Sequence, residues 1–286
     1  MTKLKVGDED VGKRLDVFVA QKMPELSRSF IKRLCDTDKI EVNNIVGVAK
    51  QKMKVNDSVS VIFDIKTLED IPKIDLPILY EDDDCIVIDK PAGLLTHSKG
   101  AFNLEPTVAT FLADRIKDMA GNRAGIVHRL DRATSGVMIC AKTPQALTWL
   151  QKQFSIRKVK KTYIAIIEGR LDPAAAIIDM PIERHPARPK IFRVGENGKT
   201  ASTEYRTKKT ANGLSMLKLM PKTGRTHQLR VHLKQLGHPI LGDFLYDGKE
   251  ADRLYLHALS LEITLPNHSR QVFNTTLPGE FNDLLK

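Results

Sequence analysis

The sequence predicts an α+β protein whose larger part is built on a mixed, largely antiparallel sheet. Short apolar runs with strand character occur at residues 85–89, 136–141 and 162–169. Helical periodicity is confined to a few segments that do not alternate regularly with these runs, which disfavours a doubly wound parallel sheet. The length of 286 residues indicates either two domains or one large domain with a small module.

The small module is predicted at residues 1–64. Leu15, Phe18 and Val19 form one helical stripe, and Ser27 is placed to cap a second helix. That second helix has an apolar side (Phe30, Ile31, Leu34) and a basic side (Arg28, Lys32, Arg33). Strand-like pieces follow at residues 39–44 and 58–63. The charged, proline-containing stretch 65–77 is predicted to be a linker to a larger domain at 78–286.

Helices are predicted at three places in the larger domain. The first covers 105–119, with Pro106 in its first turn. The second begins at Thr143-Pro144, and the third covers 226–236 and stops at Gly237. On the third helix the spacing places the polar residues His227, Arg230 and Lys234 on one shared face.

Composition and charge exclude several protein classes and favour one kind of partner. Three isolated cysteines without a CxxC pair argue against a disulfide framework and suit a reducing cytosol. The chain begins without an apolar run and contains no long apolar stretch, so we expect no signal peptide and no membrane helix. Of the net charge of +10, residues 151–234 carry 19 basic and 6 acidic side chains. This region predicts either a surface that binds a polyanion or a solvated basic face.

Three polar clusters are candidates for chemistry, and each also has a purely structural interpretation. Asp131 lies between two arginines in the sequence HRLDRATSG, which favours either an ionised active-site carboxylate or a structural ion pair. Tyr163 follows two lysines and is either a stacking platform or a half-buried strand tyrosine. The helix after Thr223 either binds phosphate through its arginines or is merely solvated. Nucleotide-binding fingerprints and metal-ligand spacings are absent from the sequence.

Taken together, these clusters resemble the RluA-type pseudouridine synthases. The matching segments follow the order of that family: ILYEDDDCIVIDKPAGLLTH (78–97), HRLDRATSGVMICAKT (128–143), KKTYIAI (160–166), GKTASTEYR (198–206) and TGRTHQLRVHLKQLGHPILGD (223–243). Residues 1–64 resemble, more loosely, an S4 RNA-binding domain. The resemblance implies the pseudouridine synthase fold for the larger domain and an isomerase that needs no cofactor or metal.

The resemblance also implies roles for individual residues. Asp131 corresponds to the essential aspartate, Arg230 to the arginine that pairs with it, and Tyr163 to the tyrosine that stacks on the target base. Leu229 would add apolar contact to the base, and Arg129 would fill the space that the flipped base leaves. RNA contacts are expected from further basic residues of both domains: Lys160, Lys161, Arg225, His227, Arg14, Arg28, Lys32 and Arg33.

The resulting prediction is a cytoplasmic, monomeric enzyme that isomerises uridines in structured RNA. Large-subunit ribosomal RNA is the first choice of substrate and transfer RNA the second. The alternative is a non-catalytic RNA-binding or ribosome-assembly protein that keeps the same fold. The joint presence of Asp131, Tyr163 and Arg230 favours the enzyme. A glycosidase is disfavoured because the sequence pairs no second acid with Asp131.

Overall fold

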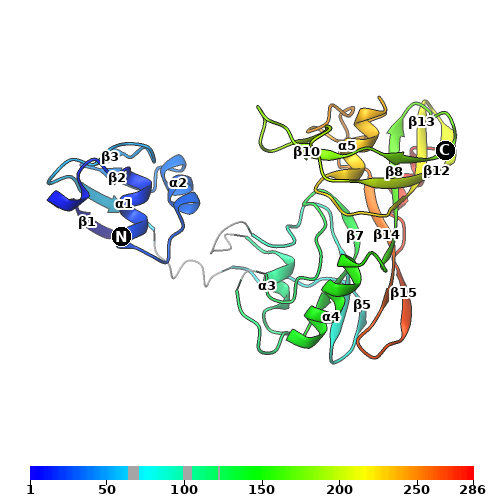
Figure 1. Cartoon of the computed structure of the whole chain (residues 1–286), viewed down its shortest axis with the longest axis horizontal. Coiled ribbons are helices and arrows are strands. Elements are labelled where there is room, and N and C mark those ends of the chain that lie inside the picture. Colours follow the sequence, from blue (N-terminus) through cyan, green and yellow to red (C-terminus); the bar gives the residue numbers. More distant parts are fainter. Residues whose placement is uncertain (64–70, 99–104, 122) are drawn as a thin grey trace. The chain divides into compact units, whose positions relative to one another are not determined.

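The computed structural model describes residues 1–63, 71–98, 105–121 and 123–286. These residues form two compact units (Figure 1). The first comprises Met1–Ile74 and His97–Thr110, and the second Asp75–Thr96 and Phe111–Lys286. Each unit has its own hydrophobic core. Residues 65–70 of the predicted linker, 65–77, lie outside the described residues.

The first unit packs two helices on a small antiparallel sheet of order β1-β4-β2-β3. Its elements are β1 (Thr2–Lys5), the 3₁₀ turn η1 (Asp8–Asp10), α1 (Leu15–Lys22), α2 (Arg28–Asp36), β2 (Ile40–Val42), β3 (Ile45–Val46) and β4 (Ser58–Val61). Both helix predictions are confirmed: Ser27 caps α2 by accepting a hydrogen bond from the backbone N–H of Phe30 at 3.3 Å. The predicted apolar stripes of α1 and α2 are buried, whereas the basic side of α2 is exposed.

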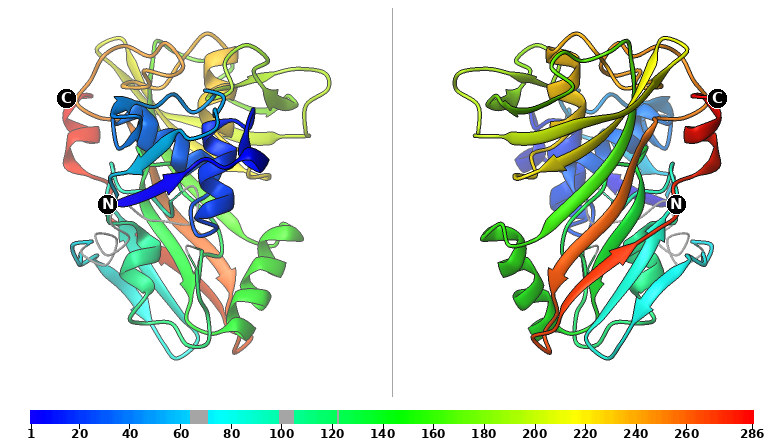
Figure 2. Two further views of the ribbon diagram at one scale, coloured as in Figure 1. Left: turned by 90° about the vertical axis from the view of Figure 1, so that its left-hand side faces the viewer. Right: turned by 90° about the vertical axis from the view of Figure 1, so that its right-hand side faces the viewer.

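The second unit is built on a large mixed sheet, which confirms the predicted fold class. Its strands run in the order β5-β6-β7-β14-β8-β13-β12-β9, with β15 also paired to β14. They are β5 (Ile78–Glu81), β6 (Cys85–Lys90), β7 (Ser135–Ala141), β8 (Lys160–Glu168), β9 (Ala175–Asp179), β12 (Ser202–Ala211), β13 (Leu214–Pro221), β14 (Leu256–Thr264) and β15 (Arg270–Asn274). The strands β10 (Ile182–Arg184) and β11 (Phe192–Val194) form a separate hairpin. Figure 2 shows the long strands β8 (green) and β14 (orange) side by side.

Among the strand pairs of this sheet that the structure describes, one is parallel. There His257 and Ala258 of β14 pair with Ser135 and Gly136 of β7. Gly136 has a φ of +114°, and a Cβ at this position would lie 2.2 Å from the carbonyl oxygen of Ala258. Glycine is therefore required where the loop that carries Asp131 enters the sheet.

The remaining helices confirm two sequence predictions and correct a third. Helix α4 (Pro144–Ser155) is capped by the Thr143 hydroxyl, and α5 (Gln228–Gln235) ends before Gly237, whose φ is +81°. The helix predicted at 105–119 is only α3 (Val108–Leu112). It stops early because the N–H of Lys117 donates to the carbonyl of Lys142 on the neighbouring chain segment, and Asp118 takes a left-handed conformation. The short α6 (Gly279–Asp283) lies near the C-terminus.

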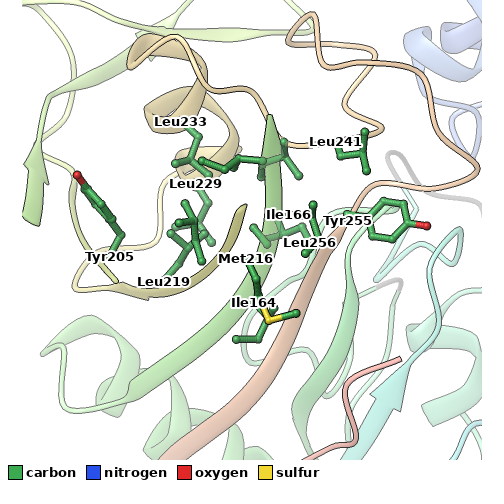
Figure 3. Close-up of a cluster of buried hydrophobic side chains, with 14 of the residues drawn as sticks. Ile164, Ile166, Tyr205, Met216, Leu219, Leu229, Leu233, Leu241, Tyr255 and Leu256 are labelled. Atoms are coloured by element: carbon green, nitrogen blue, oxygen red, sulfur yellow. The ribbon is translucent and has the colours of Figure 1, made fainter. Parts of the chain in front are cut away.

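The main core of the second unit lies between the sheet and α5 (Figure 3). Leu229 and Leu233 of α5 pack with strand residues such as Ile164 and Leu219. This packing fixes the face of α5 that carries the polar residues described below. The three cysteines are buried free thiols. Within the described ranges, no helix combines the length and apolar character needed to cross a bilayer.

Candidate active site

A cavity of about 460 Å³ opens in the second unit where three polar segments of the sequence converge. It is lined by the loop before β7, by the region from the end of α4 to β8, and by the segment from the end of β13 into α5. The sheet brings these segments together because β8 pairs with both β13 and β14, and β14 in turn pairs with β7. The cavity has the size of an ordinary small-molecule site.

Asp131 lies in the loop that leads into β7, and its side chain is 19% exposed. Its carbonyl accepts a hydrogen bond from the N–H of Thr134, which closes a tight turn. The next carbonyl, that of Arg132, accepts from Gly93 N–H at 2.8 Å and from the Lys90 ammonium at 3.3 Å. Lys90 is fully buried and also donates to the carbonyls of Pro91 and Leu94. The loop that presents Asp131 is thus tied to the segment after β6.

Arg230 faces Asp131, with Nη1 3.6 Å from Oδ2 of the carboxylate. Its main partner is a different acid: Nε and Nη2 donate to the two carboxylate oxygens of Asp243 at 2.7 and 2.6 Å. Burial opposes the charge of Arg230, but the hydrogen bonds and charge of Asp243 outweigh it and raise the pKa of the guanidinium. The predicted pairing with Asp131 is therefore one of two contacts of the Arg230 guanidinium. The other contact, with Asp243, holds the guanidinium in place.

His227 is the second group that faces Asp131. Its Nε2 lies 3.8 Å from the same oxygen, Oδ2, and its Nδ1 lies 2.7 Å from the hydroxyl of Tyr246. His227 precedes α5 as its N-cap residue, with a left-handed φ of 56°. Burial lowers the pKa of its imidazole and outweighs the charge of Asp131. His227 is therefore not part of a shared helical face with Lys234, which instead pairs with Asp247.

The buried Gln228 holds the strained turn at His227 in place. Its Oε1 accepts from the Thr223 hydroxyl and from the N–H of Arg225, and its Nε2 donates to Ser202 and Thr203. A non-glycine residue in a sparsely populated conformation costs about 1–3 kcal/mol, which the surrounding contacts must offset. The hydrogen-bonded amide supplies contacts of this kind, so the His227 ring keeps its direction.

The cavity has an aromatic and apolar wall. Tyr163 sits on β8 between Leu219 of β13 and Ala258 of β14, and Leu229 completes the wall from α5. Burial and the negative charge of Asp131 both raise the pKa of the Tyr163 phenol, which stays neutral. A neutral aromatic ring next to a carboxylate can stack on a flat ligand that carries polar groups at its edge.

Four of the residues predicted to bind RNA line the cavity: Arg129, Lys161, Arg225 and His227. Lys161 is largely enclosed, donates to the carbonyl of Thr223 at 3.1 Å, and has its pKa lowered to about 8 by burial. The adjacent Lys160 points elsewhere and pairs with Glu262 at 3.1 Å.

The other four predicted RNA-binding residues, Arg14, Arg28, Lys32 and Arg33, belong to the first unit. Arg14 and Arg28 both contact the buried carboxylate of Asp16, at 2.9 and 3.1 Å. Burial would raise the pKa of Asp16, but the hydrogen bonds from these two arginines outweigh it and lower the pKa. Both arginines therefore have a structural role within their own unit.

Sequence reasoning missed Asp243, Lys90 and Tyr246. Asp243 ends the matched segment GHPILGD, and the need of a buried arginine for a carboxylate could have singled it out. Lys90 ends the apolar strand β6, and a lysine is almost never fully buried unless its charge is compensated. The described residues contain no group of three His, Cys, Asp or Glu side chains arranged to hold a metal ion.

Comparisons with known proteins show the family of the chain. The model of the RNA pseudouridylate synthase family matches residues 84–235, which include Asp131, Tyr163 and Arg230. Ribosomal large subunit pseudouridine synthase D of Nitrosomonas europaea is 38% identical, over 99% of this chain and 87% of that protein. The protein of the same name from Borreliella burgdorferi is also 38% identical, over 94% of this chain and 87% of its own length.

A solved structure adds a likeness in three dimensions. The human RNA pseudouridylate synthase domain containing 4 is 28% identical, covers 73% of this chain and 91% of its own, and superposes with a TM-score of 0.59. The extent of the family match and the identity to whole relatives lead to one conclusion: the chain belongs to the RNA pseudouridylate synthase family and is an isomerase.

Proposed function

We propose that the protein converts specific uridines of large-subunit ribosomal RNA to pseudouridine, with Asp131 as the essential carboxylate. The choice of RNA is supported by the names of the relatives from Nitrosomonas europaea and Borreliella burgdorferi. The observation that carries the assignment of the site is the position of Asp131 Oδ2. It lies 3.6 Å from Arg230 and 3.8 Å from His227, in a cavity that Tyr163 also lines.

The reaction rearranges one nucleotide without a net redox change. The N1–C1′ bond breaks, the uracil turns, a C5–C1′ bond forms, C5 loses its proton and N1 gains one. Asp131 can act by attack on C1′, by addition to the base or by abstraction of a sugar proton, and each route needs an ionised carboxylate. Arg230, held by Asp243, keeps a positive charge next to that carboxylate.

The target nucleotide has to leave its helix to reach the cavity, which costs a few kcal/mol of lost stacking. Tyr163 is proposed to stack on the base and Leu229 to contact its apolar face. Arg129, exposed at the rim, would fill the space that the base vacates. Lys160, Lys161, Arg225 and His227 would contact the RNA around it.

The first unit is proposed to act as an S4-like second grip on the RNA. Its contacts would come from the basic side of α2, where Arg28, Lys32 and Arg33 lie, and from Arg14. Two linked weak sites raise overall affinity without any new chemistry. We further propose that the enzyme is cytoplasmic, in keeping with its three free thiols, and that it acts as a monomer.

Mapping pseudouridine in cells that lack the gene tests this proposal. Carbodiimide treatment and primer extension would be applied to ribosomal and transfer RNA from the deletion strain, with native protein or Asp131→Asn restored from a plasmid. In the deletion strain, specific stops of reverse transcriptase at pseudouridines of large-subunit ribosomal RNA are expected to be lost. Only the native protein is expected to restore them. Stops lost only from transfer RNA would overturn the choice of RNA, and unchanged stops in both would overturn the assigned activity.

A further inference from the structure

Tyr246 is buried between the β10–β11 hairpin and the two groups that face Asp131. It is 4% exposed and packs with Ile182 and Val231. Its hydroxyl contacts Phe192 of the hairpin and His227 before α5, and its ring lies 5.0 Å from the guanidinium of Arg230. A single side chain thus touches the hairpin and both groups opposite the carboxylate.

The Tyr246 hydroxyl lies between one fixed donor, the backbone N–H of Phe192, and a ring nitrogen of His227 that can either donate or accept. The backbone N–H of Phe192 donates to the oxygen at 3.0 Å, so the single hydroxyl proton is available to the other partner, Nδ1 of His227, at 2.7 Å. Burial raises the pKa of Tyr246 to about 12 and lowers that of His227, so both groups are neutral. A neutral imidazole that accepts at Nδ1 carries its proton on Nε2, the nitrogen that faces Asp131.

The hairpin also carries an exposed basic surface, which suits contact with RNA phosphates. Arg184, Arg188, Lys190 and Arg193 are exposed on and between its strands. On its inner side Phe192 meets the ring of His227 edge-on, with centroids 5.7 Å apart. A shift of the hairpin would therefore alter the acceptor geometry of Tyr246 and, through it, the ring of His227.

We propose that Tyr246 is a positioning residue for the isomerisation, which fixes His227 as the Nε2–H tautomer facing Asp131 and links it to the seating of the β10–β11 hairpin. The proposal rests on the proposed function of Asp131. Tyr246 acts through His227 and, by its cation–π contact, through Arg230.

Kinetics of Tyr246→Phe test the proposal, because this variant loses the hydroxyl and keeps the ring. Single-turnover tritium release would be measured with the full chain and an in vitro transcript of large-subunit ribosomal RNA labelled at uridine C5. The rate constant is expected to fall about three- to tenfold, the equivalent of one neutral hydrogen bond, with RNA affinity unchanged. Tyr205→Phe is the matched control, since it removes a buried hydroxyl that bonds to Pro173 away from the cavity.

A double-mutant cycle shows whether Tyr246 acts through His227. If it does, Tyr246→Phe combined with His227→Ala is no slower than His227→Ala alone. Multiplied losses, or a loss that Tyr205→Phe reproduces, would overturn the proposal.

A spectroscopic readout is independent of the RNA. Long-range ¹⁵N–¹H spectra of histidine-labelled protein report the tautomer of His227, identified by the signal that His227→Gln removes. The native protein is expected to show the Nε2–H form and Tyr246→Phe a mixture of tautomers. An unchanged tautomer in Tyr246→Phe would refute the proposal. If the native protein releases no tritium, the proposed function fails, and the spectrum still decides the tautomer.

Discussion

The cations around Asp131 and those on α2 have the same chemistry but opposite surroundings. Arg230 has a side chain that is 7% exposed and makes two hydrogen bonds of 2.7 Å or less to Asp243. On α2, Lys32 and Arg33 are exposed, and Arg28 is 57% exposed where it reaches Asp16. A buried charge interacts strongly with its neighbour. An exposed ion pair, in contrast, contributes only about 0–1 kcal/mol to folding stability. The first set is suited to organising a reacting carboxylate and the second to adding screened RNA contacts.

Removing the carboxylate that holds Arg230 is expected to have the largest effect among the variants that sharpen this contrast. In Asp243→Asn one of the two acceptors is lost, and breaking a buried pair costs about 3–5 kcal/mol of unfolding free energy. Single-turnover tritium release should fall about 100-fold, as when a preorganised electrostatic group is lost. Asp247→Asn is the control, because its carboxylate is exposed and pairs with Lys234. Equal effects of the two variants would refute the assigned role of Asp243.

Lys90 should make folding stability depend on pH. Burial lowers its pKa to about 7, so the unfolded chain binds more protons than the native state above that pH. The unfolding free energy of the native protein should therefore rise with pH relative to that of Lys90→Met. The rise is about 2–3 kcal/mol between pH 7 and 9, at about 1.4 kcal/mol per pH unit. Urea unfolding at several pH values measures the difference, and parallel curves for the two proteins would contradict it.

Lys161 should make RNA affinity depend on pH. Its pKa of about 8 means that its positive charge is lost as the pH rises through that value. The dissociation constant should increase about tenfold between pH 7 and 9, the worth of about 1.5 kcal/mol for one charge-assisted contact. Lys161→Met should abolish this change. Lys160→Met removes the adjacent exposed lysine and should leave the pH dependence of the dissociation constant unchanged. If Lys160→Met also abolished this dependence, Lys161 would not be its source.

The basic side of α2 is expected to give the smallest effect. Lys32→Ala with Arg33→Ala should weaken RNA binding a few-fold and reduce the slope of log affinity against log salt by about 0.7 for each phosphate that is no longer neutralised. The rate at saturating RNA should stay the same. Arg14→Ala should instead lower the melting temperature, because it removes two hydrogen bonds from the buried Asp16. A changed rate at saturating RNA in the first variant would break the division between the two regions.

Local signals in the sequence were enough to predict most of the fold. Ser27 and Thr143 cap helices because short polar side chains before an apolar run satisfy free backbone N–H groups. The helix predicted at 105–119 failed because its continuation competes with a hydrogen bond to Lys142, a residue far away in the sequence. The parallel pairing of β14 with β7 likewise depends on a contact between distant segments.

The main residues of the candidate site were predictable from the sequence, but the contacts that hold them in place were not. Asp131, Tyr163 and Arg230 were singled out from the sequence, and the cavity brings them together. The role of Asp243 depends on a turn that folds back beside α5, and that of Tyr246 depends on the hairpin reaching the same place. Neither follows from spacing along the chain, because both rest on tertiary contacts.

Tritium release from C5-labelled uridine is the most direct measure of the proposed activity, because isomerisation must expel the hydrogen at C5. Unmodified large-subunit ribosomal RNA and transfer RNA would be incubated separately with the native protein and with Asp131→Asn. We expect release from ribosomal RNA by the native protein, equal in moles to the pseudouridine formed, and a rate at least ~10⁴-fold lower for the variant. RNA binding without release by the native protein, or equal release by Asp131→Asn, would contradict it.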